Sequence, residues 1–497
     1  MKLLRGASDL FVNGGTLTQI SIFDAFRKIN RTTNLYNNMM ERETTWRFSR
    51  AFWVANTVEL FERAAYYGVF IVITLYLSRI LGFSDIQAGF ISGTFSALLY
   101  LLPTFSGALA DKIGFRSGLL LAFALLSIGY LGLGLLPTML QSAGLVHYSH
   151  VTEFSGLRES SAKWGILPVM ALIIIGGSFI KSVISGTVSK ETTEQNRARG
   201  FSIFYAMVNI GAFSGKTIVK PLREAMGNEG LITLNYFSAG ATLLGFIVVF
   251  FLFKTSHHEG QGKSLKEIFY ALIRVVTNVR LIVLILIISG FWMVQHQLYA
   301  TMPKYVLRMA GEGASPSWYA NVNPLVVVLT VGLITQLMRR KMAITSMTVG
   351  MFIMPISALA MASGNMVAKE PILGMHPVAF MMVVGIIFQG IAESFISPRF
   401  LEYFSLQAPR GEEGLYLGFS HLHSFISSLV GFGLSGYLLG KYCPDPLTLT
   451  EAEKLHAYDH AHYIWFVFVG IAVVSAISLV IYGKVTAAID ARRIKEI

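Results

Sequence analysis

The chain has 497 residues, of which 54% are hydrophobic and only 14% are charged, and its formal net charge is +12. Its mean hydropathy of +0.58 excludes an ordinary soluble globular protein of this length and indicates an integral membrane protein. Because the basic residues are spread over many segments rather than gathered into one patch, the positive charge does not indicate a nucleic-acid partner.

Apolar runs of about 20 residues or more, long enough to cross a bilayer as helices, recur after the first 50 residues. The first six are predicted at residues 51–79, 84–110, 116–138, 165–189, 199–222 and 230–253. The second six are predicted at residues 281–307, 317–338, 342–364, 374–400, 412–440 and 461–484. The sequence therefore predicts an all-α membrane protein whose twelve transmembrane helices form two six-helix bundles.

These runs divide the chain into five predicted parts. They are an N-terminal tail (1–50), a first bundle (51–253), a linker (254–280), a second bundle (281–485) and a C-terminal tail (486–497). The linker is expected to contain an amphipathic helix on the inner membrane surface, because apolar residues recur at helical spacing at Leu265, Ile268, Phe269, Leu272 and Val276. A simple tether between the bundles explains this helix without any role in chemistry.

The distribution of Lys and Arg predicts the orientation of the chain. An N-terminus inside the cell places most of these residues in cytoplasmic segments, as the positive-inside rule requires, and an even number of spans then makes both termini cytoplasmic. The first 50 residues lack the pattern of a cleaved secretory signal and are expected to form a poorly ordered tail. We expect a multi-pass protein of the plasma (inner) membrane, active as a monomer.

Several patterns are set aside as unrelated to chemistry. The stretch GFGLSG (431–436) matches a dinucleotide-binding fingerprint but lies in an apolar run without a preceding strand; together with Gly440 it predicts close approach of neighbouring helices. His421 and His423 are two positions apart, so on a helix they point about 200° apart and are not expected to form one ligand face. Cys443 is the single cysteine, which excludes an internal disulfide. We expect no catalytic residues, no metal, no cofactor and no enzymatic activity.

The first predicted helix carries an unusual group of charges in the stretch VELFERAAYYG. Glu59 and Arg63 are four positions apart, and Glu59 and Glu62 are three apart, so with Tyr66 and Phe70 they form one stripe on the helix. A charge at bilayer depth costs about 3 kcal/mol or more, so such residues line cavities, pair with one another, or mark ion and substrate paths. A buried structural salt bridge is the alternative interpretation.

Other predicted helices also place polar side chains at depth: Lys181 in the fourth, Gln295, His296 and Gln297 in the seventh, and Glu393 and Arg399 in the tenth. These residues come from both halves of the chain. Ion pairs between two bundles that break on one side and form on the other are typical of an alternating-access carrier.

The sequence also resembles a known family. GALADKIGFR (107–116), in the loop after the second predicted helix, looks like the signature loop of the major facilitator superfamily. ELFERAAYYG resembles the first-helix motif of the proton-dependent oligopeptide transporters, with Ala64 in place of a phenylalanine, and FSIFYAMVNIGAF (201–213) closely matches their fifth-helix signature. ALLYLLPTFSGALAD and AESFISP are similar to their second and tenth helices. Two helices that bacterial members often insert between the halves are absent.

This resemblance implies roles for particular residues. Glu59, Glu62 and Arg63 would couple protons, Lys181 and Glu393 would form a cytoplasmic gate, and Gly107, Asp111, Gly114 and Arg116 would belong to the conformational loop. The lining of the substrate pocket would include Tyr66, Tyr67, Tyr100, Asn209, Trp292 and His296.

The chain departs from the family pattern at three places. Phe70 and His296 stand where many members have an arginine and its acidic partner, which implies that the outer gate closes through other contacts. A tryptophan of the eleventh helix is replaced in GFSHLHSF. Placed at the mouth of the cavity, His296 is either a pH-dependent contact for an anionic group or a neutral structural residue, and both interpretations stay open.

The sequence therefore predicts a secondary active transporter, with proton-coupled uptake of short peptides or related small zwitterionic solutes as the leading function. Its partners would be the solute, protons and the lipid bilayer. Two alternatives remain: a carrier for another organic solute with altered or no proton coupling, and a ligand sensor that keeps the transporter fold.

Overall fold

The computed structural model describes residues 48–148, 157, 160–193, 196–254, 264–338, 340–367, 370–407 and 419–495. Within these ranges the secondary structure is helical and contains no strand. The expected disorder of the N-terminal tail concerns residues 1–47, which lie outside the described ranges.

The described residues of the first half contain ten helical elements before the linker. They are α3 (Arg50–Phe70), α4 (Ile73–Leu75), the π-helix η1 (Tyr76–Ile80), α5 (Asp85–Leu101), α6 (Pro103–Ile113), α7 (Phe115–Ser142), the 3-10 helix η2 (Ser161–Gly165), α8 (Ile166–Lys190), α9 (Arg197–Met226) and α10 (Asn228–Leu252).

The second half follows the linker helix α11 (Leu265–Thr277). Its elements are α12 (Val279–Gln295), α13 (Gln297–Ala300), α14 (Met302–Ala310), α15 (Pro316–Tyr319), α16 (Val322–Met338), α17 (Ala343–Ala362), α18 (Gly364–Val367), α19 (Pro377–Leu406), α21 (Leu422–Tyr442), the 3-10 helix η3 (Pro446–Thr448), α22 (Glu451–Lys454) and α23 (Tyr463–Lys495).

Nine helical segments of the described chain are long and apolar enough to cross a membrane, and a tenth is counted when α3 and the α4–η1 segment, bent by 45°, are taken as one span. The α5–α6 segment is interrupted at Leu102, before Pro103, so α5 and α6 are each too short to cross alone, and α9 carries several basic residues that lower its hydropathy. With these two segments the arrangement has the twelve transmembrane helices that the sequence predicts.

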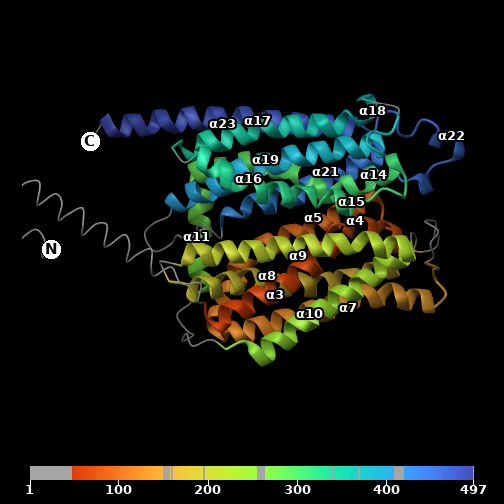
Figure 1. Ribbon diagram of the computed structural model, residues 1–497, viewed down its shortest axis with the longest axis horizontal. Coiled ribbons are helices and arrows are strands. Elements are labelled where there is room, and N and C mark those ends of the chain that lie inside the picture. Colours follow the sequence, from red (N-terminus) through yellow and green to blue (C-terminus); the bar gives the residue numbers. More distant parts are fainter. Residues whose placement is uncertain are drawn as a thin grey trace, which may run out of the picture.

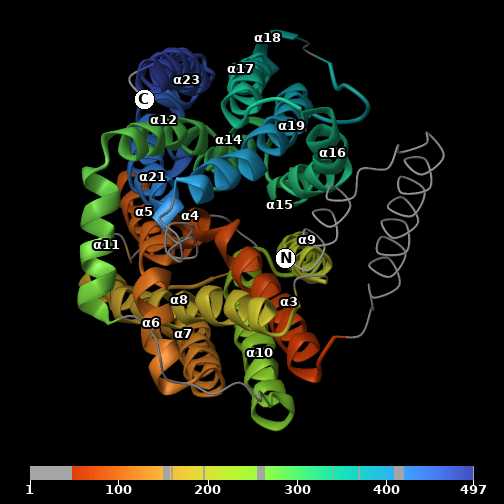
Figure 2. The ribbon, with the colours of Figure 1, turned by 90° about the vertical axis from the view of Figure 1, so that its left-hand side faces the viewer.

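The helices run side by side and form two bundles (Figure 1). Seen along the helices in Figure 2, the segments from α3 to α10 lie below and those from α12 to α23 lie above. Helix α11 crosses from one bundle to the other at the end where α23 terminates (Figures 1 and 2). Helices α4, α14, α15 and α22 lie at the opposite end (Figure 1).

Glycines permit close contact between the bundles where α5 packs against α21. A Cβ at Gly89 would approach the Phe432 carbonyl oxygen to 2.5 Å, and a Cβ at Gly436 would collide with the Asp85 backbone. The Ser96 and Ser428 hydroxyls share a hydrogen bond of 2.9 Å across the same contact. The expected role of the 431–436 stretch in helix packing is thus met at Gly436, whereas Gly440 faces open space.

Helix α11 forms where the linker was expected to be amphipathic. Ser264 caps it, because its hydroxyl accepts the Glu267 N–H while the Glu267 carboxylate accepts the Ser264 N–H. Ile268 and Val275 are buried, whereas Phe269 is 54% exposed. The helix therefore presents one apolar side to the protein and leaves another uncovered.

The signature stretch 107–116 was expected to be a loop, but most of it is helical. Helix α6 continues to Ile113, and Gly114 alone separates it from α7, with φ of +91°. A non-glycine residue is strained at this φ, which explains the glycine at this position. The Asp111 side chain lies outside what the structure describes.

A first prediction concerns the α5–α21 contact. Gly436→Leu should lower the free energy of unfolding by about 1–3 kcal/mol or more, because a side chain there overlaps the α5 backbone. Gly440→Leu, one turn further along α21, is the matched control and should leave stability nearly unchanged. Thermal unfolding in detergent measures both variants, and equal midpoints would contradict the packing role of Gly436.

Candidate functional site

A cavity of about 330 Å³ lies between the two bundles. Its lining residues come from α3, α5 and α9 of the first half and from α12, α13, α16, α19 and α21 of the second. All six residues predicted to contact the substrate are in its wall: Tyr66, Tyr67, Tyr100, Asn209, Trp292 and His296. Their role in binding stays a prediction, but the structure brings them together at one place.

A ring of aromatic and histidine side chains forms part of the wall. Tyr100 stacks on His421 at 6.2 Å between centroids, and His423 stacks on Trp292 at 5.3 Å. His296 closes the ring, 5.8 Å from Trp292 and 6.3 Å from Tyr100. The prediction that His421 and His423 face apart is wrong, because both rings line the cavity and their centroids are 6.2 Å apart.

His296 lies in the cavity wall rather than at its mouth. It is 5% exposed, and its Nδ1 is 3.4 Å from the Ser427 hydroxyl and 3.3 Å from the Ser428 hydroxyl. Within the part of the chain that the structure describes, these histidines join no group of three metal-ligating side chains.

The charged cluster of α3 forms as its spacing predicts. Arg63 contacts the Glu62 carboxylate, and its Nε lies 3.2 Å from Glu59 Oε1. All three residues are at most 7% exposed, and Glu59 Oε2 has no hydrogen-bond partner among the described atoms. The guanidinium lies 5.3 Å from the centre of the Tyr66 ring and 6.0 Å from that of Tyr67. The cluster is thus separated from the cavity only by two tyrosines of the cavity wall.

Lys181 and Glu393 lie apart in this conformation. The Lys181 ammonium is 3.7 Å from the centre of the Tyr100 ring and donates to the Leu99 carbonyl. The Glu393 carboxylate instead accepts from Gln295 at 2.9 Å and from Asn323 at 3.3 Å. The gate pair remains a prediction for another conformation.

A further cation of the cavity wall was not singled out from the sequence. Lys216 of α9 is 2% exposed and lines the cavity. Its position within the predicted fifth span is the same kind of signal that identified Lys181 in the fourth. The resemblance of the neighbouring stretch FSIFYAMVNIGAF to a family signature indicated Asn209 as the pocket residue of this helix.

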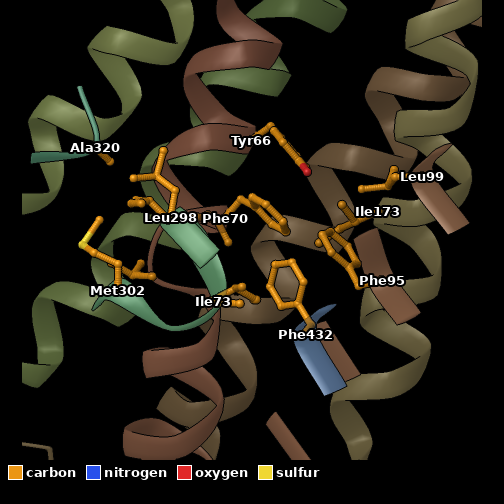
Figure 3. Packing of buried hydrophobic residues seen from close by; sticks show 14 of the residues in the cluster. Tyr66, Phe70, Ile73, Phe95, Leu99, Ile173, Leu298, Met302, Ala320 and Phe432 are labelled. Atoms are coloured by element: carbon orange, nitrogen blue, oxygen red, sulfur yellow. The ribbon is translucent and has the colours of Figure 1, made fainter. Parts of the chain in front are cut away.

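Aromatic rings fill the space beside the cavity (Figure 3). Phe70 stacks on Tyr66 at 5.0 Å and lies 5.0 Å from Tyr299 and 5.8 Å from Phe432. Phe95 lies 6.3 Å from Phe70 on another side. Phe70 thus replaces a possible charged contact between the bundles with aromatic packing.

Ion pairs join the bundles beyond this aromatic layer. Asp85 of α5 pairs with Lys304 at 2.7 Å and with Arg308 at 2.8 Å, both on α14. Arg308 also donates to the Cys443 carbonyl at 2.6 Å. As the departures at Phe70 and His296 imply, this end is closed by contacts other than a pair at those two positions.

A second ionic contact lies in the connection between α14 and α15. Glu312 pairs with Arg79 at 2.5 Å and with Arg223 at 2.8 Å. Partial burial would raise the pKa of Glu312, but hydrogen bonds and charges from Arg79 and Arg223 outweigh burial and hold that pKa below its ordinary value. The contact is therefore present above the ordinary carboxyl pKa and is lost only as the pH falls through the lowered value.

The signature stretch lies at the opposite end of the first bundle. Gly107 packs against the Ser182 side chain of α8, and Arg116 donates to the Phe250 carbonyl of α10 at 2.7 Å. These contacts connect neighbouring helices of one bundle. Their part in conformational change stays a prediction.

A family model described as Major Facilitator Superfamily matches residues 57–371. The chain belongs to the major facilitator superfamily. This family consists of membrane carriers rather than enzymes, and its fold accounts for the two bundles and the cavity between them.

Among similar members, the dipeptide and tripeptide permease B of Shigella dysenteriae serotype 1 (strain Sd197) is 25% identical, over 86% of this chain and 94% of that protein. The dipeptide and tripeptide permease A of Escherichia coli (strain K12) is 29% identical, but the match covers 33% of this chain and 29% of that protein.

Solved structures have the same fold. A peptide transporter POT in complex with sulfate superposes with a TM-score of 0.66 at 17% identity, over 88% of this chain and 95% of that one. A POT family transporter in complex with 5-aminolevulinic acid gives a TM-score of 0.65 at 19% identity, over 88% and 97% of the two chains.

A second prediction tests the closed end of the superfamily fold. Asp85→Asn should leave Lys304 and Arg308 with weaker partners and favour opening, so that labelling of the buried Cys443 by a membrane-impermeant maleimide becomes about tenfold faster or more.

Glu451→Gln is the matched control, because Glu451 pairs locally with Lys454 on the exposed surface. It should label like the wild type. Equal labelling rates in all three proteins would show that Asp85 does not hold this end closed.

Proposed function

We propose that this protein is a secondary active transporter that works by alternating access and couples the uptake of short peptides or related small zwitterionic solutes to protons. The observation that carries the proposal is the sharing of Arg63 by two buried carboxylates beside a cavity between the bundles. The permease relatives and the peptide-transporter folds support the choice of substrate class.

The geometry of the cluster suggests which carboxylate receives the proton. Arg63 engages Glu62 closely, whereas Glu59 has one oxygen without a partner. Protonation of Glu59 therefore sacrifices less interaction than protonation of Glu62. Glu62 keeps Arg63 paired in both protonation states.

Charge balance links this proton to Lys181. Lys181 borders a narrow crevice together with Glu62, Arg63 and Tyr66. While Glu59 is ionised, the two carboxylates balance Arg63 and Lys181. A proton on Glu59 leaves one positive charge in excess, which favours movement of Lys181 toward Glu393. The proposed gate pair thus forms when the proton is bound.

The two ends of the cavity differ in this conformation. Ion pairs of Asp85 and Glu312 hold one end, whereas at the α11 end the wall includes the exposed residues Leu401 and His421. We assign the α11 end and both termini to the cytoplasm, and the excess of Lys and Arg in the corresponding segments supports this assignment. In this assignment the structure represents a state open to the cytoplasm.

The remaining assignments follow the same topology. We assign the protein to the plasma (inner) membrane and treat one chain as the functional unit, with protons, the solute and lipid as its partners. The five-part division of the chain is retained. We assign a role in conformational change to Gly107, Asp111, Gly114 and Arg116. Gly107 and Arg116 contact the neighbouring helices α8 and α10, whose packing could change when the first bundle moves.

A second candidate is a carrier for another organic solute without proton coupling. Two features favour this candidate. Phe70 and His296 stand where the resembling family has a charged pair, and aromatic and histidine rings form part of the cavity wall. Transport that is indifferent to the proton gradient would select this candidate.

A third prediction tests proton coupling with dialanine as the solute in proteoliposomes. Glu59→Gln should abolish accumulation driven by a proton gradient, because it removes the proton site. Glu62→Gln should do the same, because Arg63 is then free to hold Glu59 ionised. Both variants should retain exchange of internal for external dialanine.

Glu451→Gln is again the control and should accumulate dialanine normally, since Glu451 lies in an exposed pair. Gradient-driven accumulation by Glu59→Gln at the wild-type level would contradict the coupling assignment. Loss of folding in both variants would instead support a structural salt bridge.

A fourth prediction concerns the gate. Lys181→Ala should reduce transport at least about tenfold, because it leaves Glu393 unpaired in the state closed to the cytoplasm. Adding Glu393→Ala should cost less than the sum of the two single effects. Strictly additive losses would show that the two residues act separately.

A further inference from the structure

The cation of α9 has a place in the cavity that the proposed function does not explain. Lys216 is 2% exposed, and its ammonium makes one hydrogen bond, of 3.3 Å, to the Ala320 carbonyl. Among the residues that the structure describes, no carboxylate lies within ion-pair distance of it. An ammonium has three donors, so most of its bonding capacity is unused.

Two aromatic rings orient this ammonium. Its Nζ lies 5.4 Å from the centre of the Tyr67 ring and 5.8 Å from that of Tyr299. Contacts with ring faces compensate a buried cation only in part, by about 0.5–2 kcal/mol each. Burial of an unpaired charge costs more than this, so the site favours an additional anionic partner.

The backbone fixes where Lys216 can act. Helices α3 and α9 meet at Gly68 and Gly215, where a Cβ on Gly215 would collide with the Ala64 carbonyl. Lys216 follows directly after this crossing, so its side chain is directed past Tyr67. The tight crossing therefore fixes the backbone position from which the ammonium reaches the cavity.

The cavity also holds Glu393, which interacts electrostatically with Lys216 but forms no ion pair with it. The Glu393 carboxylate is bound by the amides of Gln295 and Asn323 instead. The cavity therefore presents a cation and an anion that are not paired with each other. Such an arrangement is complementary to a solute with separated opposite charges.

We propose that Lys216 binds the carboxylate of the solute in this cavity and thereby selects solutes with a free acid group. The proposal rests on the proposed function, since it assumes that the solute occupies this cavity. It adds a residue and a chemical preference for one end of the solute.

The test uses the purified full-length protein and two pairs of probes. Dialanine is compared with its C-terminal amide, and 5-aminolevulinic acid with its methyl ester, by titration calorimetry. The wild type should bind each free acid about tenfold more tightly than the neutral derivative, because a charge-assisted contact is lost in the derivative. Lys216→Met should bind acid and derivative equally, whereas Lys216→Arg should keep the preference.

Lys220→Met is the matched control. Lys220 lies one turn further along α9, is paired with Glu224 at 3.6 Å, and lines a separate pocket at the end closed by Glu312. It should behave as the wild type. Without a probe, Lys216→Met should unfold at an equal or higher temperature than the wild type, because it removes a buried unpaired charge.

The outcomes separate the two proposals. If the wild type binds neither form of dialanine, the peptide assignment fails, and the 5-aminolevulinic acid pair still tests Lys216. A folded Lys216→Met protein that keeps the acid preference, or a wild type without any preference, overturns the role of Lys216. If chloride or inorganic phosphate, but neither free acid, gives a signal that Lys216→Met abolishes, the residue holds an inorganic anion and the proposal is also overturned.

Discussion

The cavity depends on one constraint: a single guanidinium on α3 must satisfy two carboxylates away from water. Arg63 lies between Glu59 and Glu62, and the three residues are nearly inaccessible. Water cannot screen a net charge on these three residues, so the gain or loss of one proton changes the electrostatic energy of the cluster and of the cavity beside it. Tyr66 and Tyr67 separate the cluster from the solute, which places both binding events in one electrostatic environment.

The closed end of the cavity also avoids unpaired charges away from water, but it does so with aromatic packing close to the cavity. Close to the cavity, Phe70 packs with Tyr299 and Phe432 and brings no charge that would need a partner. Nearer the membrane surface, ion pairs replace rings, as at Glu312, where hydration lowers the cost of separating them. The aromatic layer thus excludes water from the cavity without adding a charge, whereas opening of this end must separate the buried Asp85 from Lys304 and Arg308.

The sequence predicted most of this arrangement because charges in apolar helices are rare and their helical spacing is fixed. Helical spacing identified the cluster of Glu59, Glu62 and Arg63, and the resemblance to the oligopeptide transporters supplied six residues that line the cavity. The sequence could not predict that His421 and His423 face the same cavity, since the positions of their rings depend on packing rather than on local pattern. The place of Lys216 within an apolar span was a usable signal, but the absence of an ion-pair partner for it depends on the packing of α3, α15 and α19 and could not be predicted.

In the proposed mechanism the solute and a proton cross the membrane together. This co-transport is measured as the pH of the lumen of proteoliposomes, followed with a trapped dye while dialanine is added outside and the membrane potential is clamped. We expect the lumen to acidify in proportion to the dialanine taken up by the wild type, and Glu59→Gln to exchange dialanine without acidification. Dialanine uptake by the wild type at constant luminal pH would contradict this mechanism.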